Sequence, residues 1–325
     1  MIVLDKIKRD LEEKILDFNA RARESYASVL DLDESGLRDF IEENIGGIGR
    51  AKKLDPQSLA SYEGLGGIVG VDGSVNRKGG ASPHYIEFFR ALAKSTRKSL
   101  EPVLATEVYS PILDPEGLEG EVKDRRDEIL TRLEVQVAIG AAEKLDPHLI
   151  MMDGSFIRYI INCKSLWEEL RTICESKGIL LIGVIEDIKT NIIGTRLVEE
   201  GLMRNPAYDR ELLFGRLGLG EFILIRYGVS QKSRAGELSS AFMRTSLSPN
   251  IIGIDIIDTQ RKYLGEMASL VYSLTPENSR GVPIWLDIVD REVKISSRMM
   301  EMYLENYLDR DIYERFFVEA RSKRV

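Results

Sequence analysis

The sequence predicts an α/β fold in which a mixed sheet is flanked by helices. Several short apolar runs have the length and composition of buried or half-buried strands. These strands are expected at residues 67–72, 85–93, 102–110, 149–153 and 179–185. Residues 121–145 and 283–307 carry apolar side chains at three- and four-residue intervals, which predicts amphipathic helices beside the sheet.

Residues 1–58 precede the first predicted strand. Their pattern predicts one or two polar helices that end near Asn44, and then a linker. A group of glycines at 46–49 interrupts the helical pattern. Such a group could also form a phosphate-binding loop. That alternative is less favoured because no strand precedes the glycines and no Gly-Lys-Ser sequence follows them.

The tripeptide Asp-Gly-Ser directly follows two predicted strands, as residues 72–74 and 153–155. A carboxylate at the end of a buried strand is costly to keep charged unless a cation or a hydrogen-bonding turn compensates it. Each Asp-Gly could simply form a turn, and Ser74 and Ser155 are expected to stabilise such turns. The matched repetition favours instead a paired-carboxylate site for a hard cation such as Mg²⁺ or Mn²⁺.

The predicted helix at 121–145 follows the antiparallel strands and a turn at 113–117. Ile129, Leu133 and Val137 form its apolar stripe, and Glu134 stands directly beside that stripe. Glu134 could supply a third acid to the site. It could also pair on the surface with a basic residue one turn away, and the sequence alone slightly favours this second interpretation.

Residues 190–245 predict short helices and a strand at 221–227, and they look like an insertion that shapes substrate access or partner contacts. A further strand at 250–258 carries Asp255 and Asp258. Its alternating polarity, and the absence of a following Asp-Gly-Ser, favour structural roles for both acids.

Residues 283–307 predict one long helix that begins after Pro283. Its apolar contacts are expected from Ile284, Ile288, Ile295, Met299, Met302 and Leu304. Asp287 and Asp290 stand in its early turns, where the helix dipole favours acidic side chains. One of them could instead face the strand-end acids and complete a metal cage.

A strand-end Asp, a helical Glu, a second strand-end Asp and a last acid on the final helix form the order of a ribonuclease H-like nuclease site. In these residues the chain resembles the NurA nucleases of archaea and some bacteria, over roughly residues 60–305. The matching segments are residues 71–74, 132–134, 152–155, 183–190 and 282–295. Many NurA proteins carry a histidine in the last segment, where this chain has Val289-Asp290. Aspartate can bind the same cations through oxygen.

The resemblance implies that four acids hold two Mn²⁺ or Mg²⁺ ions for phosphodiester hydrolysis. They are Asp72, Glu134, Asp153 and Asp290. Lys189 is expected to bind a substrate phosphate or stabilise developing negative charge, with a surface lysine as the alternative. Arg77 and Lys78 are expected either to contact the DNA backbone or to be ordinary exposed charges of a hairpin.

The resemblance further implies a function in DNA end resection and repair. The expected activities are 5′ to 3′ exonuclease and single-strand endonuclease, from a homodimer partnered by a hexameric HerA-type ATPase. The nuclease domain would span residues 59–310, with a tail at 311–325. One alternative is a non-catalytic ribonuclease H-like scaffold subunit of a DNA motor complex. Another is a metal phosphatase that acts on small molecules.

The composition bounds these hypotheses. A net charge of −8, from 45 basic and 53 acidic residues, argues against a broad DNA-coating surface but permits a narrow positive channel. Cys163 and Cys174 suggest neither a disulfide framework nor a metal motif, so a cytoplasmic location is expected. No uncharged run approaches the roughly eighteen residues that a membrane helix requires.

Overall fold

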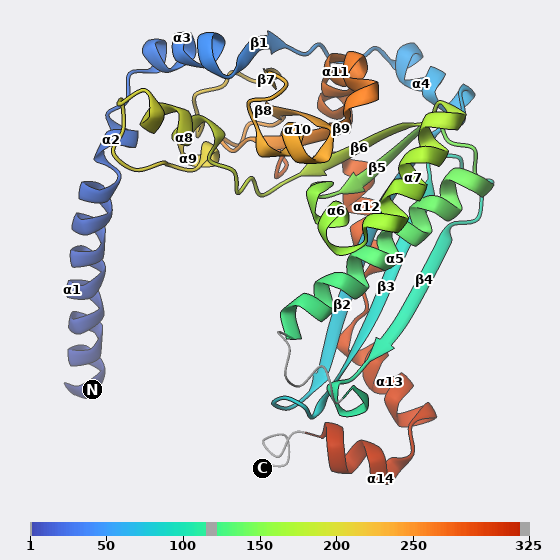
Figure 1. The fold of residues 1–325 in the computed structure, drawn as a ribbon. Helices are drawn as coiled ribbons and strands as arrows, with labels where there is room; N and C mark the ends of the chain where they lie inside the picture. The colour runs from blue at the N-terminus through green and yellow to red at the C-terminus, as the bar shows by residue number, and fades with distance from the viewer. Residues whose placement is uncertain (1, 115–121, 319–325) are drawn as a thin grey trace.

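The computed structural model describes residues 2–114 and 122–318. Within these residues, nine strands form one mixed sheet (Figure 1). In the order in which they lie side by side, the strands are β1 (Gly46–Arg50), β7 (Glu221–Ile225), β8 (Leu238–Met243), β9 (Ile252–Ile257), β6 (Leu180–Ile185), β5 (Leu149–Asp153), β2 (Ile68–Gly79), β3 (Tyr85–Ser95) and β4 (Val103–Tyr109). The turn expected at 113–117 and the tail expected at 311–325 lie partly outside the described residues.

The pairing of the central strands confirms the predicted mixed α/β fold. Strands β2, β3 and β4 form an antiparallel meander, and β5 then runs parallel to both β2 and β6. Strand β9 returns antiparallel to β6. This is the ribonuclease H-like arrangement expected from the sequence. Because parallel neighbours end at the same edge of a sheet, the residues that follow β5 and β6 meet there.

Helices cover both faces of the sheet (Figure 1). Ile150 and Met152 of β5 lie in the apolar cluster formed with α5 (Val122–Lys144) and α7 (Lys164–Lys177). Leu149 and Met151 lie in the opposite cluster, with α11 (Leu264–Leu274) and α12 (Ile284–Val293). The alternation is that of a strand buried on both sides.

The amino-terminal region contains three helical segments, α1 (Ile2–Ser25), α2 (Ala27–Leu30) and α3 (Glu34–Asn44). The predicted helical end at Asn44 is confirmed, but the predicted linker is wrong. Residues 46–50 are strand β1, which pairs antiparallel with β7. A Cβ atom on Gly46 would lie 1.8 Å from the Leu224 carbonyl oxygen, so glycine permits this close pairing.

The stretch at 190–245 is part of the main sheet and not an appendage to it. It supplies β7 and β8, together with α8 (Ile192–Glu199), α9 (Asp209–Leu212) and α10 (Gln231–Gly236). These elements lie beside the amino-terminal helices (Figure 1). Ile193, Leu197 and Leu212 share an apolar cluster with Leu37 and Ile41 of α3.

The single long helix predicted at 283–307 is wrong, because the chain forms α12 and then α13 (Ser297–Tyr307). Lys294 leaves the helix with an extended backbone, and the Ser296 side chain accepts a 3.1 Å hydrogen bond from the Met299 amide as the cap of α13. Of the expected apolar contacts, Leu304 is buried, whereas Ile284 and Met302 are exposed. The buried positions of α12 are Leu286, Val289 and Val293, which the sequence did not predict.

The remaining helices are short and lie at the ends of strands. Helix α4 (Pro56–Gly64) is capped by Asp55 before β2, and α6 (Ile157–Asn162) follows β5. Helix α14 (Arg310–Ile312) lies near the end of the described chain. None of the described helices is both long and apolar enough to cross a membrane.

Candidate active site

Asp72 lies inside strand β2 and not at its end. The strand continues to Gly79, paired throughout with β3, so the predicted strand end at Asp72 is wrong. The pairing of β2 with β5, however, stops at Val71 opposite Met152. Asp72 is therefore level with Asp153, the last residue of β5. The two carboxylates come from neighbouring strands at the point where β5 ends.

The carboxyl pKa values show that the predicted acids act on one another. Asp72 is only 8% exposed, and its burial, together with the charges of Asp153, Glu134 and Asp290, raises its pKa to about 8. Burial and the charge of Glu134 raise the pKa of Asp153 to about 6. Residues from β2, α5, β5 and α12 are thus brought into one electrostatic cluster.

Glu134 is 1% exposed, so the surface interpretation favoured by the sequence is wrong. Its carboxylate accepts a 2.7 Å hydrogen bond from the Tyr159 hydroxyl and a short one from the Arg158 guanidinium, both on α6. Arg158 also donates to the Asp153 carbonyl oxygen at 3.2 Å. The partner of Glu134 is therefore not one helical turn away but on the helix that follows the second Asp-Gly-Ser.

Arg158 was not predicted as a site residue from the sequence. A usable signal was present, because Arg158 is the only Lys or Arg between Leu149 and Cys163, a mostly apolar stretch that contains Asp153. An isolated cation beside a buried strand end calls for an anionic partner. Arg280 was also missed. It lowers the pKa of Asp153 through its charge, as Arg158 does.

The last predicted acid, Asp290, lies on α12 and is half-buried. Its carboxylate pairs with Lys294 at 2.6 Å, and its charge contributes to the raised pKa of Asp72. Asp287, the alternative acid on this helix, is paired with Arg280 at 2.8 Å. The geometry favours Asp290 over Asp287 as the fourth member of the cluster.

The predicted basic residues lie elsewhere. Lys189 is exposed and lines a separate cavity of about 580 Å³ beside Tyr26 and Phe214, whose lining contains none of the four acids. The Arg77 guanidinium stacks 3.5 Å from the centre of the Tyr85 ring, and Lys78 pairs with Glu301 at 3.0 Å. Lys189, Arg77 and Lys78 therefore remain proposals as contacts to nucleic acid.

A sequence model of the NurA domain family matches residues 66–295, which is more than half of the chain. The chain belongs to the NurA family. The crystal structure of the NurA nuclease from Sulfolobus solfataricus has 13% sequence identity and a TM-score of 0.57, covering 91% of this chain and 95% of that one. A crystal structure of NurA with manganese has 11% identity and a TM-score of 0.52, covering 94% and 100%. Comparison with curated protein sequences finds no match.

In this NurA fold, each Asp-Gly-Ser position requires a glycine, but for a different structural reason. A Cβ atom on Gly73 would lie 2.5 Å from Glu134 Oε1, so only glycine leaves room for that carboxylate. Gly154 has a φ of 113°, which favours glycine, and its amide donates to the Val184 carbonyl oxygen at 2.7 Å. One glycine makes space for an acid, and the other turns the chain out of β5.

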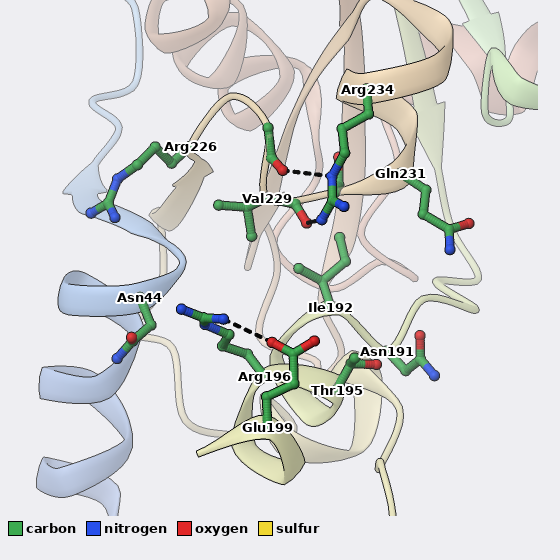
Figure 2. A pocket seen from close by; sticks show the side chains of 12 residues that line it. Asn44, Asn191, Ile192, Thr195, Arg196, Glu199, Arg226, Val229, Gln231 and Arg234 are labelled. Atoms are coloured by element: carbon green, nitrogen blue, oxygen red, sulfur yellow. Dashed lines mark hydrogen bonds and ion pairs between the residues drawn. The ribbon is translucent and has the colours of Figure 1, made fainter.

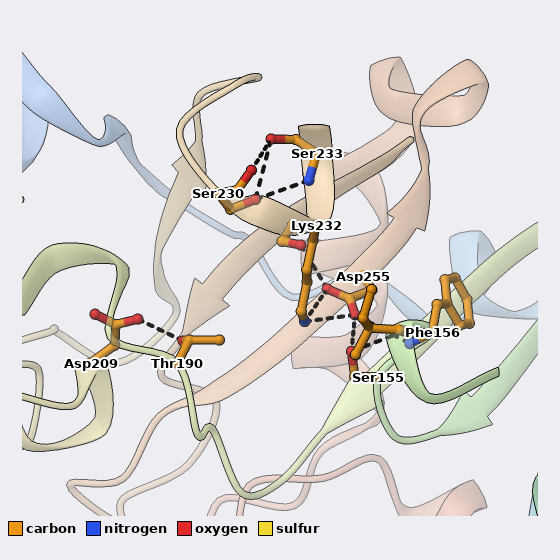
Figure 3. A network of polar contacts seen from close by, with 10 residues as sticks. Ser155, Phe156, Thr190, Asp209, Ser230, Lys232, Ser233 and Asp255 are labelled. Carbon is orange, nitrogen blue, oxygen red and sulfur yellow. Dashed lines mark hydrogen bonds and ion pairs between the residues drawn. The ribbon is translucent and has the colours of Figure 1, made fainter. Parts of the chain in front are cut away.

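A buried polar network holds the loop after Asp153 (Figure 3). Ser155 Oγ donates a 2.7 Å hydrogen bond to Asp255, which is fully buried on β9 and pairs with Lys232 Nζ at 2.9 Å. Asp255 also accepts a hydrogen bond from Ser240 at 2.6 Å. The structural role predicted for Asp255 is confirmed. Ser155 connects two strands of the sheet and does more than close a local turn.

The donor chemistry of the NurA acid cluster fits a divalent cation. Neighbouring carboxylates that raise one another's pKa supply the hard oxygen ligands that Mn²⁺ or Mg²⁺ prefers. Among the described residues, no three Asp, Glu, His or Cys side chains are arranged to hold one ion as they stand. Glu134 is bound to Arg158 and Tyr159 through Oε2.

Proposed function

We propose that this chain is a metal-dependent deoxyribonuclease whose ions are held by four acids, Asp72, Glu134, Asp153 and Asp290. The observation that carries the proposal is the convergence of these side chains from four separate elements, seen in the raised pKa values of Asp72 and Asp153. Surface acids repel one another and disperse. A cluster of buried acids is retained where a cation compensates it.

A bound pair of Mn²⁺ or Mg²⁺ ions supplies charge neutralisation and a reactive water for phosphodiester hydrolysis. The chain's own residues prepare the site. Asp72 carries a proton at neutral pH while its pKa stays near 8, and it releases that proton on becoming a ligand. Arg158 and Tyr159 orient Glu134, and the Ser155–Asp255 contact holds the loop that follows Asp153.

We propose DNA as the substrate, with activity as a 5′ to 3′ exonuclease and single-strand endonuclease in end resection and repair. A hexameric HerA-type ATPase is the proposed partner. These assignments are supported by membership of the NurA family. The proposed homodimer is supported by α1, which projects from the sheet (Figure 1) and exposes Leu11, Ile15, Leu16 and Phe18.

A second candidate function is a non-catalytic scaffold subunit of a DNA motor. It is favoured by two specific contacts, the neutralisation of Glu134 by Arg158 and the pairing of Asp290 with Lys294. A scaffold function, however, does not explain why the buried Asp72 and the half-buried Asp153 lie level with each other on neighbouring strands, and this favours the nuclease.

The decisive experiment is cleavage of end-labelled single-stranded DNA with Mn²⁺, with and without a HerA-type translocase. We expect Asp72→Asn and Asp153→Asn each to lower the rate by about 100-fold or more, because each removes a ligand of the proposed ions. The matched control is Asp39→Asn, which neutralises an exposed carboxylate on α3 and should cut at the rate of the unmodified chain.

Two results would contradict the proposal. If the folded chain cuts no DNA even with the translocase bound, the scaffold function is supported. If a small phosphate ester is hydrolysed faster than DNA, the site belongs to a phosphatase. The position of the label in the products reports the polarity of cutting.

A further inference from the structure

A second polar cavity lies apart from the acid cluster. It has a volume of about 510 Å³ and opens between the end of α3, helix α8 and the loop that joins β7 to α10 (Figure 2). None of the four acids of the candidate active site lines it. Asn44, Asn191, Thr195 and Gln231 contribute neutral polar groups to its wall. Its lining therefore combines polar side chains with the apolar side chains of Ile192 and Val229.

The cavity is positively charged although the chain as a whole is acidic. Its lining contains three guanidinium groups, those of Arg196, Arg226 and Arg234, and one carboxylate, that of Glu199. Glu199 is paired with Arg196 at 2.8 Å. Among the described residues, neither Arg226 nor Arg234 forms an ion pair. Both therefore retain their full charge at the cavity.

Arg226 and Arg234 are fixed in place by neutral acceptors. Arg226 donates to the carbonyl oxygens of Glu42 and Glu43 at 3.1 and 3.0 Å. Arg234 donates to the carbonyl oxygens of Gly228 and Val229 at 2.8 and 3.1 Å, as Figure 2 shows. A guanidinium has five N–H donors, so each retains donors for a ligand. Pre-positioned arginines lose little side-chain entropy when they bind a phosphate.

The side chains, and not the start of α8, are the groups available to an anion. The amides of Ile192 and Ile193 donate to the Asp209 carboxylate at 2.9 and 2.8 Å. Asp209 is fully buried, so it occupies the amino-terminal end of the helix from inside the protein. Recognition in the cavity therefore depends on arginine and amide side chains, which are the usual partners of phosphate oxygens.

Helix α10 connects this cavity to the candidate active site. Gln231 and Arg234 line the cavity. Lys232, between them in sequence, points the other way and binds Asp255, which holds Ser155 two residues after Asp153 (Figure 3). Helix α10 thus contacts both the cavity and the residues that hold the loop after Asp153.

We propose that this cavity binds backbone phosphates of the nucleic-acid strand whose scissile bond lies at the acid cluster. The inference rests on the proposed nuclease function. The chemistry it uses is that of arginine with a phosphodiester, and no base-specific contact is implied. The cavity would retain the strand during cutting and so favour long substrates over short ones.

The test is binding of a fluorescein-labelled 30-residue oligothymidylate, followed by fluorescence anisotropy in a chelator over a range of KCl concentrations. The variants are Asn191→Asp, which adds a negative charge to the cavity, and Arg196→Gln, which removes a positive one. Arg226 and Arg234 are left intact because they also hold backbone carbonyls. Gln57→Glu and Arg261→Gln are the matched controls, each making the same charge change at an exposed position outside the cavity.

We expect each cavity variant to weaken binding by about threefold to tenfold, with melting temperatures close to the unmodified chain. The slope of log affinity against log salt should become shallower by about 0.7 for each phosphate that the variant no longer neutralises. Affinities equal to those of the matched controls would overturn the proposal. So would a titration in which inorganic phosphate binding is weakened by Asn191→Asp while oligothymidylate binding is not, because this result assigns the cavity to a small free anion.

Because the chelator prevents metal-dependent cleavage, the binding assay tests the cavity independently of the proposed nuclease function. Binding is measured without catalysis, so unchanged affinities count against the cavity alone. Loss of DNA cleavage in the assay of Asp72→Asn and Asp153→Asn tests the acid cluster alone. A chain that binds the oligonucleotide through the cavity but cuts nothing would support the scaffold function and retain the binding site.

Discussion

Asp72-Gly73-Ser74 lies inside the twelve-residue strand β2, whereas Asp153-Gly154-Ser155 begins where β5 ends. In the first tripeptide the chain stays extended, and the glycine leaves room for Glu134 on α5. In the second the glycine turns the chain at a φ of 113°, and the serine is bonded to Asp255 on β9. Two identical tripeptides therefore do different structural work.

The comparison shows that the shared chemistry is confined to the aspartates. Both carboxylates lie at the same level of neighbouring parallel strands, and both have raised pKa values. Their glycines and serines contact different neighbouring residues. A motif repeated in a sequence can thus mark one site without repeating one local structure.

The largest expected effect comes from Gly73, the glycine of the first tripeptide. Gly73→Ala should lower nuclease activity by about 100-fold or more, because its Cβ atom displaces the Glu134 carboxylate from the site. Gly47→Ala is the control, since an added Cβ meets nothing within 4 Å there. Activity is measured with end-labelled DNA and Mn²⁺. An active Gly73→Ala protein would show that Glu134 has no part in catalysis.

The next effect separates the two aspartates by pH. Between about pH 4 and 8 the folded protein holds a proton on Asp72 that the unfolded chain has released, so stability falls as the pH rises through this window. In a chelator at pH 8 to 9, Asp72→Asn should therefore be more stable than the unmodified chain, by roughly 1–3 kcal/mol. The advantage should disappear below pH 4.

Asp153→Asn should show the same trend more weakly, with most of its gain reached by about pH 6 to 7, because the pKa of Asp153 is raised only to about 6. Thermal melting across pH 4 to 9 measures both variants, with Asp39→Asn as the exposed control. Added Mn²⁺ should reverse the order by stabilising the unmodified chain. A lower melting temperature for Asp72→Asn at pH 8 in chelator would contradict the mutual repulsion of the acids.

A smaller effect is expected at the second glycine. Gly154→Ala should cost about 1–2 kcal/mol of stability, because a φ of 113° is strained for any residue with a Cβ atom. The added Cβ meets only ordinary contacts, the nearest being Arg158 Nε at 3.4 Å. Urea unfolding measures the change. A cost as small as that of Gly47→Ala would mean that the turn after β5 relaxes freely.

The smallest effect distinguishes the two serines. Ser155→Ala should cost about 1–2 kcal/mol, since the buried Asp255 carboxylate loses a hydrogen-bond donor. Ser74→Ala should change stability by no more than about 0.5 kcal/mol, because Ser74 is half-buried and lies outside that network. Urea unfolding of the two variants side by side gives the comparison. Equal costs would mean that the Asp255 network does not stabilise the loop.

The strands were predictable where one short run of sequence decides burial. The apolar runs at β5 and β6 are confirmed because strands buried on both faces require uninterrupted apolar side chains. The strands at β3 and β4 are also confirmed, although β4 lies at the edge of the sheet and its residues alternate between half-buried and exposed. Strand β1 was missed for the converse reason. Glycine is disfavoured in strands, so nothing local indicates a strand there. Strand β1 forms because it pairs closely with β7, some 170 residues later in the chain.

In the candidate site, too, some features were predictable from the sequence and others were not. The acids could be named from the sequence because hard-cation chemistry requires carboxylates, and the repeated Asp-Gly-Ser marked two of them. The burial of Glu134 could not be read locally, since its apolar stripe and polar neighbours suit a surface position equally well. Its burial depends on Arg158 and Tyr159, which reach it from another helix.

The sequence by itself determined the type of fold and the central strands, and it nominated the candidate acids. These features depend on residue type and short-range periodicity, which any segment carries with it. Only the tertiary structure decided that Asp72 lies within a strand, that Ser155 binds β9 and that arginines gather beside α8. Each of these depends on contacts between residues far apart in the chain, and such contacts exist only once the sheet has assembled.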